Sequence, residues 1–187
     1  MTCITSRDKL PFAVTRFSTE TYEQYQQFMS KSEKNSCVYN SPVKMKPSIQ
    51  VNMPFCVLEM NNTTNQIVGA SVVTNHPRMR QYKIYEEQNY NRYSFIGKYR
   101  VSRKELNESL PLHTLELLEF MLFKEKSHMK RGQGIQCISD DLFTKGRKYL
   151  NNNQICSENT MDTLQSDIEE QFLNVINAKR CLRNNDS

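Results

Sequence analysis

The chain has 187 residues, of which 37% are hydrophobic and 24% charged, with a formal net charge of +5. A chain of this length and composition is most simply one globular domain, and its positive charge favours a polyanionic partner. It contains no run of about 18 apolar residues and no apolar segment at its start, so we expect neither a membrane-spanning helix nor a signal peptide. These features predict an intracellular protein, cytoplasmic or nuclear.

The N-terminal quarter predicts a strand, a helix and a loop. Residues 11–17, PFAVTRF, alternate as a strand does, and Ser18 or Thr19 can cap a helix that follows. The buried stripe of this helix would consist of Tyr22, Tyr25, Phe28 and Met29. Segment 34–47 has two prolines and little periodicity, which predicts a partly extended loop.

The middle of the chain carries its clearest hairpin signal. The apolar runs 54–60 and 66–74 flank the polar turn NNTTN, a pattern typical of a β-hairpin. Residues 93–106 predict another strand with a short exit. Segment 110–123 is ambiguous, because its leucine spacing suits a helix while its aromatic end suits a strand.

The C-terminal part predicts a short strand at 134–138 and a helix over 139–150. Residues 151–160 are polar and predict a linker. An amphipathic helix over about 161–182, which Asp162 can cap, either packs onto the sheet or binds a protein partner. Its apolar stripe is Leu164, Ile168, Phe172, Val175 and Ile176.

We therefore expect an α+β fold, with a small, barrel-like, mixed or antiparallel central sheet flanked by a few helices. The predicted division is a domain over 1–150, followed by the linker and amphipathic helix over 151–187.

The sequence shows no catalytic or metal-binding pattern. There is no Ser-His-Asp arrangement, H-E-x-x-H motif or P-loop, and the adjacent acidic pairs are typical of solvated surfaces. The six cysteines include no C-x-x-C pair and the three histidines are isolated, which predicts free thiols and no metal site. We expect no catalytic residue, metal or cofactor.

The segment KEKSHMKRGQGIQ, residues 124–136, combines four basic residues with two glycines. Glycine allows the backbone to approach an anion, and the cations attract phosphate, so this segment predicts a phosphate-binding edge or a solvated basic turn. Its end, RGQGIQ, also resembles the turn with which GNAT acetyltransferases bind the pyrophosphate of acetyl-CoA. In that family a helix follows the turn at once, whereas the residues after Gly134 predict a strand.

Tyrosines are dense in YEEQNYNRYSFIGKY, residues 85–99, and the chain contains no tryptophan. Tyr85 and Tyr90 stand five residues apart among polar neighbours, unlike residues of a core strand. Aromatic faces stack on nucleobases and attract methylated groups, although tyrosines also commonly pack with only the hydroxyl exposed. Tyr99 suits a packed strand position, and Tyr93 suits either role.

The order of these segments resembles the YTH domain, the reader of N6-methyladenosine in RNA, and its EVE-fold relatives. The resemblance covers roughly residues 11–145: the opening strand and helix, SCVYNS, the hairpin with its Asn-rich turn, YEEQNYNRYSFIGKY and MKRGQGIQ. It rests on collinear order and spacing, including the five-residue spacing of Tyr85 and Tyr90.

The resemblance implies a set of site residues and a partner. The aromatic cage would be Tyr39, Tyr85 and Tyr90. Asn40 and Asn61 would contact the base edge, with Asn62 equally compatible with the alignment of Asn61. Lys130 and Arg131 would hold phosphate, and the partner would be single-stranded RNA, including methylated RNA.

YTH cages are rich in tryptophan, whereas all three matched positions here are tyrosine, whose smaller face gives a weaker cation–π attraction. This difference predicts lower affinity for a methylated adenine, or preference for another modified base. Three hypotheses follow: a non-enzymatic RNA reader, a GNAT-type acetyltransferase, and a scaffold that kept the fold without the pocket.

Overall fold

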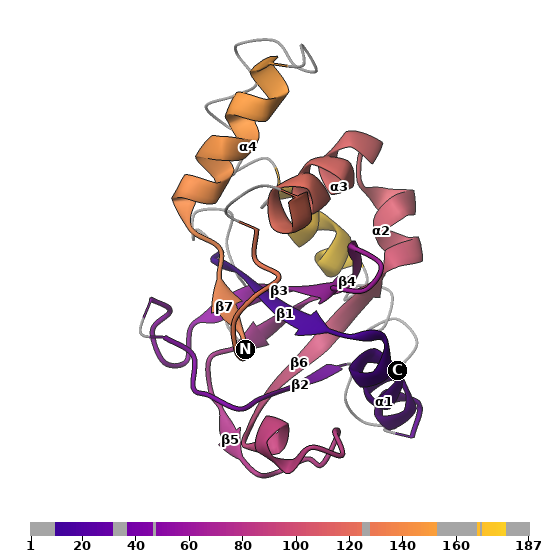
Figure 1. The fold of residues 1–187 in the computed structure, drawn as a ribbon, viewed down its shortest axis with the longest axis vertical. Coiled ribbons are helices and arrows are strands. Elements are labelled where there is room, and N and C mark those ends of the chain that lie inside the picture. Colours follow the sequence, from indigo (N-terminus) through magenta and orange to yellow (C-terminus); the bar gives the residue numbers. More distant parts are fainter. Residues whose placement is uncertain are drawn as a thin grey trace.

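The computed structural model describes residues 10–31, 37–46, 48–124, 128–152, 168 and 170–178 (Figure 1). The elements are β1 (Phe12–Phe17), α1 (Thr19–Ser30), β2 (Cys37–Ser41), β3 (Pro54–Asn61), β4 (Gln66–Thr74), β5 (Arg78–Met79), the 3-10 helix η1 (Gln88–Asn91), β6 (Tyr93–Ser102), α2 (Arg103–Ser109), α3 (Leu112–Glu119), the π-helical turn η2 (Phe120–Lys124), β7 (Gln136–Cys137) and α4 (Asp140–Asn152).

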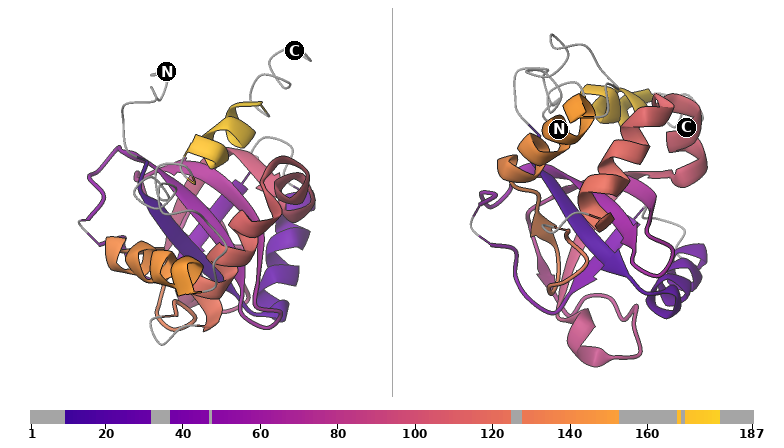
Figure 2. Two further views of the ribbon diagram at one scale, coloured as in Figure 1. Left: turned by 90° about the horizontal axis from the view of Figure 1, so that it is seen from above. Right: turned by 45° about the horizontal axis from the view of Figure 1, so that its top comes forward.

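These strands form one mixed sheet in the order β2-β6-β4-β3-β1-β7, and β5 pairs with β6 on the edge opposite to β2. The pair β1–β3 is parallel and the other pairs are antiparallel. The sheet curls strongly into a half-barrel (Figure 2), which confirms the predicted α+β class with a barrel-like sheet.

Local signals position the first strand and helix as predicted. The Ser18 side chain accepts a hydrogen bond from the backbone N–H of Thr21, whose side chain accepts one from the backbone N–H of Ser18. This reciprocal capping satisfies two free donors at the start of α1. Tyr25 lies buried on the helix face that packs against the sheet, with its ring 5.9 Å from that of Tyr39.

The predicted hairpin is also confirmed. β3 and β4 pair from Pro54↔Thr74 to Asn61↔Gln66, and Asn65 takes a positive φ of 56° in the connecting turn. Gly69 lies so close to the ion pair of Glu59 and Arg100 that an added Cβ would be 2.5 Å from a Glu59 carboxylate oxygen.

Three segments differ from or refine the sequence expectations. A strand, β2, occupies part of the predicted loop 34–47, because it pairs with β6 from Cys37↔Gly97 to Ser41↔Tyr93. The predicted exit of β6 is the helix α2, which begins with a capping box between Ser102 and Glu105. The ambiguous segment 110–123 is helical from Leu112 and ends in a π-helical turn.

The sheet separates two apolar cores, because alternate residues of a strand face opposite sides. From β3, Cys56 and Leu58 enter one core, whereas Phe55 and Val57 enter the other. The first core is covered by α2, α3, η2, α4 and residues 170–178, and the second by α1 (Figures 1 and 2).

Residues 170–178 are helical and belong to the predicted amphipathic helix. Ile168, Phe172 and Ile176 are buried, and the Phe172 ring meets Phe12 of β1 edge to face at 5.6 Å. The apolar stripe therefore packs against the domain in this part of the chain. Asp162, Leu164 and the linker residues 153–160 lie outside the described residues, and no described helix is long and apolar enough to cross a membrane.

Candidate ligand-binding cleft

A cleft of about 210 Å³ lies where the ends of several elements meet. We call it the tyrosine cleft. Its walls come from the end of β1, the start of α1, residues beside the ends of β2 and β3, Tyr85, Tyr90 and the turn 132–134. Sites for drug-sized ligands typically measure about 300–1,000 Å³. The volume is therefore suited to one small group.

Tyr85 and Tyr90 form one corner of the tyrosine cleft. Their ring centroids are 6.0 Å apart with an interplanar angle of 79°, an edge-to-face arrangement. Tyr85 is 6% exposed and Tyr90 is 44% exposed, so one ring is a fixed wall and the other reaches solvent. Burial raises the pKa of Tyr85 above its ordinary value, which keeps its phenol neutral.

Asn91 holds the segment that carries Tyr85. Its Oδ1 accepts hydrogen bonds from the backbone amides of Ile84 and Tyr85 at 2.9 and 3.0 Å, and its Nδ2 donates to the Tyr85 carbonyl at 2.6 Å. Nothing in the sequence singles out Asn91. An asparagine directly after a tyrosine in a polar segment carries no recognisable motif, because its role depends on the folded loop.

Asn40, a predicted base-edge contact, lines the tyrosine cleft but already has several partners. Its Nδ2 donates to Asn91 Oδ1 at 2.9 Å and to the Tyr82 carbonyl at 2.8 Å, while its Oδ1 accepts from Ser94 Oγ at 2.7 Å. Both amide hydrogens are thus used within the protein. Asn40 connects β2 to the Tyr85 loop.

Asn61 and Asn62 have different roles at the hairpin turn. Asn61 Oδ1 accepts from the backbone amides of Thr63 and Thr64 at 3.0 and 3.2 Å, so this side chain stabilises the turn. Asn62 lines the tyrosine cleft and donates from Nδ2 to the Lys130 carbonyl at 2.9 Å. Its Oδ1 is buried without a hydrogen-bond partner among the described residues. Of the two aligned alternatives, Asn62 is the one that the structure brings to the cleft.

Tyr39 lies in the core and does not line the tyrosine cleft. Its hydroxyl donates to Glu59 Oε1 at 2.7 Å and accepts from Ser71 Oγ at 2.8 Å, and its ring stacks on Tyr25 with an interplanar angle of 20°. Neighbouring strand residues face opposite sides, so Asn40 turns to the cleft while Tyr39 turns inward. The structure brings together two of the three predicted cage tyrosines, Tyr85 and Tyr90.

A buried ion pair explains the position of Tyr39. Glu59 is fully buried and accepts two hydrogen bonds from Arg100, Nε to Oε1 at 2.7 Å and Nη2 to Oε2 at 2.5 Å. Burial alone would lower the pKa of Arg100, but the Glu59 carboxylate raises it above its ordinary value. Because a buried carboxylate needs donors, the hydroxyls of Tyr39 and Tyr25 complete its shell.

The basic segment contributes its backbone to the tyrosine cleft. Gly132 and Gly134 line it with positive φ angles of 125° and 66°, which glycine adopts without strain. Lys130 Nζ donates to Asn65 Oδ1 at 2.7 Å, and Arg131 is exposed. Neither of these two predicted phosphate ligands lines the cleft itself.

Arg16 places a cation in the wall of the tyrosine cleft. No sequence motif identifies it as a site residue. Its guanidinium donates to the carbonyls of Gly134 and Met129 at 2.7 and 3.2 Å and to Gln136 Oε1 at 3.0 Å. Burial lowers its pKa from the ordinary value, and no carboxylate among the described residues forms an ion pair with it. The available signal was a lone charge within the strand pattern PFAVTRF.

The rim outside the tyrosine cleft is negatively charged, unlike the wall that carries Arg16. A wider region of about 680 Å³ continues outward past Tyr85 and Tyr90, and Glu20, Glu86 and Glu87 line it. Carboxylates repel phosphates, so this side of the opening disfavours a polyanion. The described residues also contain no group of three or more His, Cys, Asp or Glu side chains that could hold a metal ion.

The turn 132–134 precedes the strand β7, and α4 begins only at Asp140. The helix that follows such a turn directly in GNAT acetyltransferases is therefore displaced here by a strand. Comparison with known proteins finds no match to a family model, to a curated protein or to a solved structure.

Proposed function

We propose that the protein is a YTH-like reader of single-stranded RNA, which binds one extruded base, N6-methyladenine or a close analogue, in the tyrosine cleft. Sequence-specific RNA readers commonly take an unstacked base between aromatic groups and hydrogen-bond its edge. The curled α+β sheet, the paired tyrosines and the Asn62 carbonyl support this function.

The unpartnered Oδ1 of Asn62 is the observation that carries the proposal. A buried acceptor without a partner costs about 1–3 kcal/mol, and a ligand N–H would recover this free energy. Asn62 Nδ2 is bonded to the Lys130 carbonyl at 2.9 Å, which fixes the amide with Oδ1 as the free atom. Asn62 lines the cleft, and a rotation of its side chain would bring this acceptor to the single N–H that N6-methyladenine retains on its exocyclic nitrogen.

The two tyrosines give this base a surface. One ring can stack on the base while the edge-to-face partner contacts the methyl group, and each base–aromatic contact contributes about 1–3 kcal/mol. The Arg16 cation favours electron-rich ligand atoms over cationic ones. Binding involves no chemical change of the RNA, so the protein acts as a binding module.

The charges around the cleft set the path of the RNA backbone. Glu20, Glu86 and Glu87 disfavour phosphates on the outer side of the tyrosines. Lys130 and Arg131, directly before the turn 132–134, attract them. The strand thus enters along the basic turn.

The test is fluorescence anisotropy with single-stranded RNA oligonucleotides that carry adenosine, N6-methyladenosine or N6,N6-dimethyladenosine at one position. The monomethyl form is expected to bind most tightly, and the dimethyl form weakly because it offers no N–H to Asn62. Tyr90→Ala and Asn62→Leu should remove this preference. The matched control is Met79→Ala, which shortens an apolar side chain that is 65% exposed on β5.

Equal, salt-dependent binding of all three oligonucleotides would contradict base recognition. Thermal stabilisation by acetyl-CoA in the same protein would instead support an acetyltransferase. If neither ligand binds, the scaffold hypothesis replaces the reader.

A further inference from the structure

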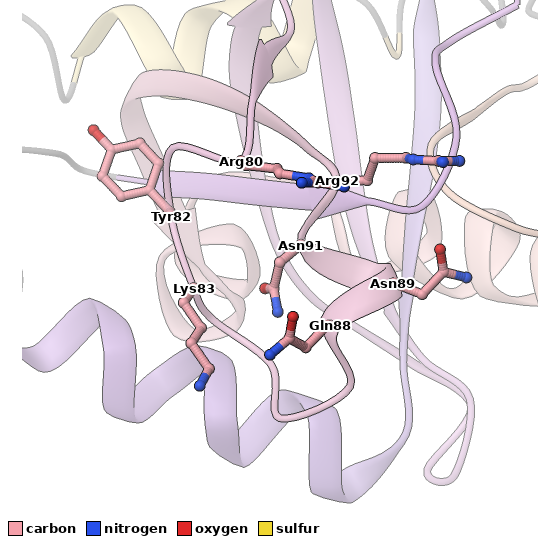
Figure 3. Close-up of a pocket in the computed structure, with 7 residues that line it drawn as sticks. All are labelled: Arg80, Tyr82, Lys83, Gln88, Asn89, Asn91 and Arg92. Carbon is pink, nitrogen blue, oxygen red and sulfur yellow. The ribbon is translucent and has the colours of Figure 1, made fainter.

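A second pocket, of about 350 Å³, lies on the other side of η1 and is lined by three basic residues and no acidic one (Figure 3). Arg80 and Lys83 come from the segment before η1, and Arg92 follows its last residue. The other lining residues are Tyr82, Gln88, Asn89 and Asn91. We call this the basic pocket.

The backbone holds two of the cations together. The Arg80 amide donates to the Arg92 carbonyl at 3.0 Å, and Arg80 adopts a left-handed φ of 48° that turns the chain sharply after β5. None of the ion pairs among the described residues includes Arg80, Lys83 or Arg92. Their positive charges are therefore available to a bound anion.

The acidic residues of the same loop face elsewhere. Glu86 and Glu87 line the outer region beside the tyrosines and not the basic pocket. Glu87 is further fixed because its Oε1 accepts from the Asn89 amide at 3.3 Å. The loop thus separates its charges, leaving cations and amide groups at the basic pocket.

The basic pocket adjoins the surface that leads to the tyrosine cleft. Asn89 lines both the basic pocket and the outer region, and that region shares Tyr85 and Tyr90 with the cleft. Asn91 also lines the basic pocket, and its side-chain Oδ1 accepts the Tyr85 backbone amide and so holds Tyr85 in place. A ligand that crosses η1 over the neutral side chain of Asn89, and not past Glu86 and Glu87, could therefore occupy both sites.

We propose that the basic pocket binds a backbone phosphate of the single-stranded RNA whose base enters the tyrosine cleft. The identity of the strand rests on the proposed function, whereas the phosphate chemistry rests on the pocket alone. Arginine pairs with phosphate through parallel N–H donors, and the amides of Gln88 and Asn89 add neutral donors. The two sites then contact different nucleotides, on either side of η1.

The test is the salt dependence of binding, with a nine-nucleotide RNA carrying central N6-methyladenosine and with free N6-methyladenosine as the short probe. The variant Arg80→Gln/Arg92→Gln should weaken binding of the nine-mer several-fold. It should also lower the slope of log K against log salt by about 0.7 for each phosphate that the protein no longer neutralises. Binding of the free nucleoside should not change.

The control Lys104→Gln/Lys148→Gln removes the same charge from exposed positions on α2 and α4, at the opposite end of the molecule from η1 (Figure 1). It should leave the salt slope close to that of the unmodified protein. Lys83→Gln, a single change at an exposed site, provides a second variant if the double variant unfolds.

An unchanged salt slope in the Arg80/Arg92 variant, or no binding of the nine-mer at all, would overturn the proposal. A methyl preference that persists with an unchanged slope would contradict phosphate binding in the basic pocket, while base recognition in the tyrosine cleft would stand. A slope that depends on Arg80 and Arg92 without any methyl preference would support the basic pocket and contradict base recognition.

Discussion

Asn40 and Asn91 join through a side-chain hydrogen bond of 2.9 Å, from Asn40 Nδ2 to Asn91 Oδ1. Asn40 belongs to β2 at the edge of the sheet, and Asn91 ends η1 in the loop that carries both cleft tyrosines. Because the same Oδ1 accepts the Tyr85 amide, the position of this ring is determined by the sheet. The wall of the cleft is therefore preorganised before any ligand binds, which reduces the ordering cost of binding.

Replacing Asn91 by alanine should release this loop. The substitution leaves the buried amides of Ile84 and Tyr85 without acceptors, at a cost of about 1–3 kcal/mol for each unpaired group. Native-state hydrogen exchange should show lost protection at residues 84 and 85 and retained protection in the β3–β4 hairpin. The control Asn89→Ala, at an exposed position on the same loop, should leave protection unchanged both at residues 84 and 85 and in the hairpin. Full protection of Tyr85 in the Asn91 variant would contradict this role.

Breaking the Glu59–Arg100 pair should be far more costly than breaking a surface pair. Glu59→Ala leaves a largely buried guanidinium without its carboxylate, and such a loss costs about 3–5 kcal/mol. The matched pair is Lys104–Glu108 on α2, at 3.9 Å with side chains 85% and 62% exposed. Glu108→Ala should cost less than about 0.5 kcal/mol.

Urea denaturation of both variants measures this difference. A loss of similar size in the two variants would show that the buried pair stabilises no more than an exposed one. In Glu59→Ala, removal of the carboxylate should also free the Tyr39 hydroxyl, which a change in the ultraviolet absorbance of tyrosine can report.

The sequence predicts those elements whose signals are local. Ser18 begins α1, and the polar turn between 54–60 and 66–74 marks the hairpin, because caps and turns act over a few residues. The strand β2 depends instead on pairing with β6, more than fifty residues away, so its own composition indicates a loop. Pairing over such a distance leaves no signal in either segment alone.

The same limit applies to the site. Five-residue spacing indicates that Tyr85 and Tyr90 act together, and the structure brings both to one cleft. Tyr39 is drawn into the core by Glu59, a carboxylate inside an apolar strand that no sequence window connects to it. Asn62 and Arg16 gain their roles from contacts with residues 129–136, which only the folded chain brings near them.

Stability should fall at alkaline pH because of Cys37. Burial, with a smaller effect of the Glu59 carboxylate, raises the pKa of its thiol from 9.0 to about 11. The folded chain holds this proton more tightly than the unfolded chain does. The stabilisation is therefore complete below pH 9 and is lost as the pH rises to about 11, a fall of about 2 kcal/mol.

Urea unfolding between pH 8 and pH 11 checks this dependence. Cys37→Ala should flatten the profile between pH 8 and pH 10, whereas Cys137→Ala, at a half-buried thiol, should keep the decline. Tyr25 and Tyr39, whose pKa values burial also raises, should continue the decline above pH 10 in every variant. A Cys37→Ala profile parallel to that of the unmodified protein would contradict the assignment to this thiol.

Arg16→Lys should loosen the turn while keeping the charge. The guanidinium bonds the Gly134 and Met129 carbonyls and Gln136 at once, whereas the lysine ammonium is a compact group on a flexible stem and cannot reproduce that planar fork. Losing one hydrogen bond to a charged group costs about 1.5–3 kcal/mol, so affinity for the N6-methyladenosine oligonucleotide should fall about tenfold or more. Hydrogen exchange at residues 132–136 should speed up in parallel.

The control for Arg16 is Arg131→Lys, an exposed position directly before the same turn. Because a surface lysine attracts phosphate as arginine does, this change should alter the affinity less than about twofold and leave exchange in the turn unchanged. If Arg16→Lys binds the oligonucleotide as tightly as the unmodified protein while its turn exchanges faster, the geometry of the turn does not determine binding. Unchanged exchange would instead show that the three hydrogen bonds of Arg16 do not hold the turn in solution.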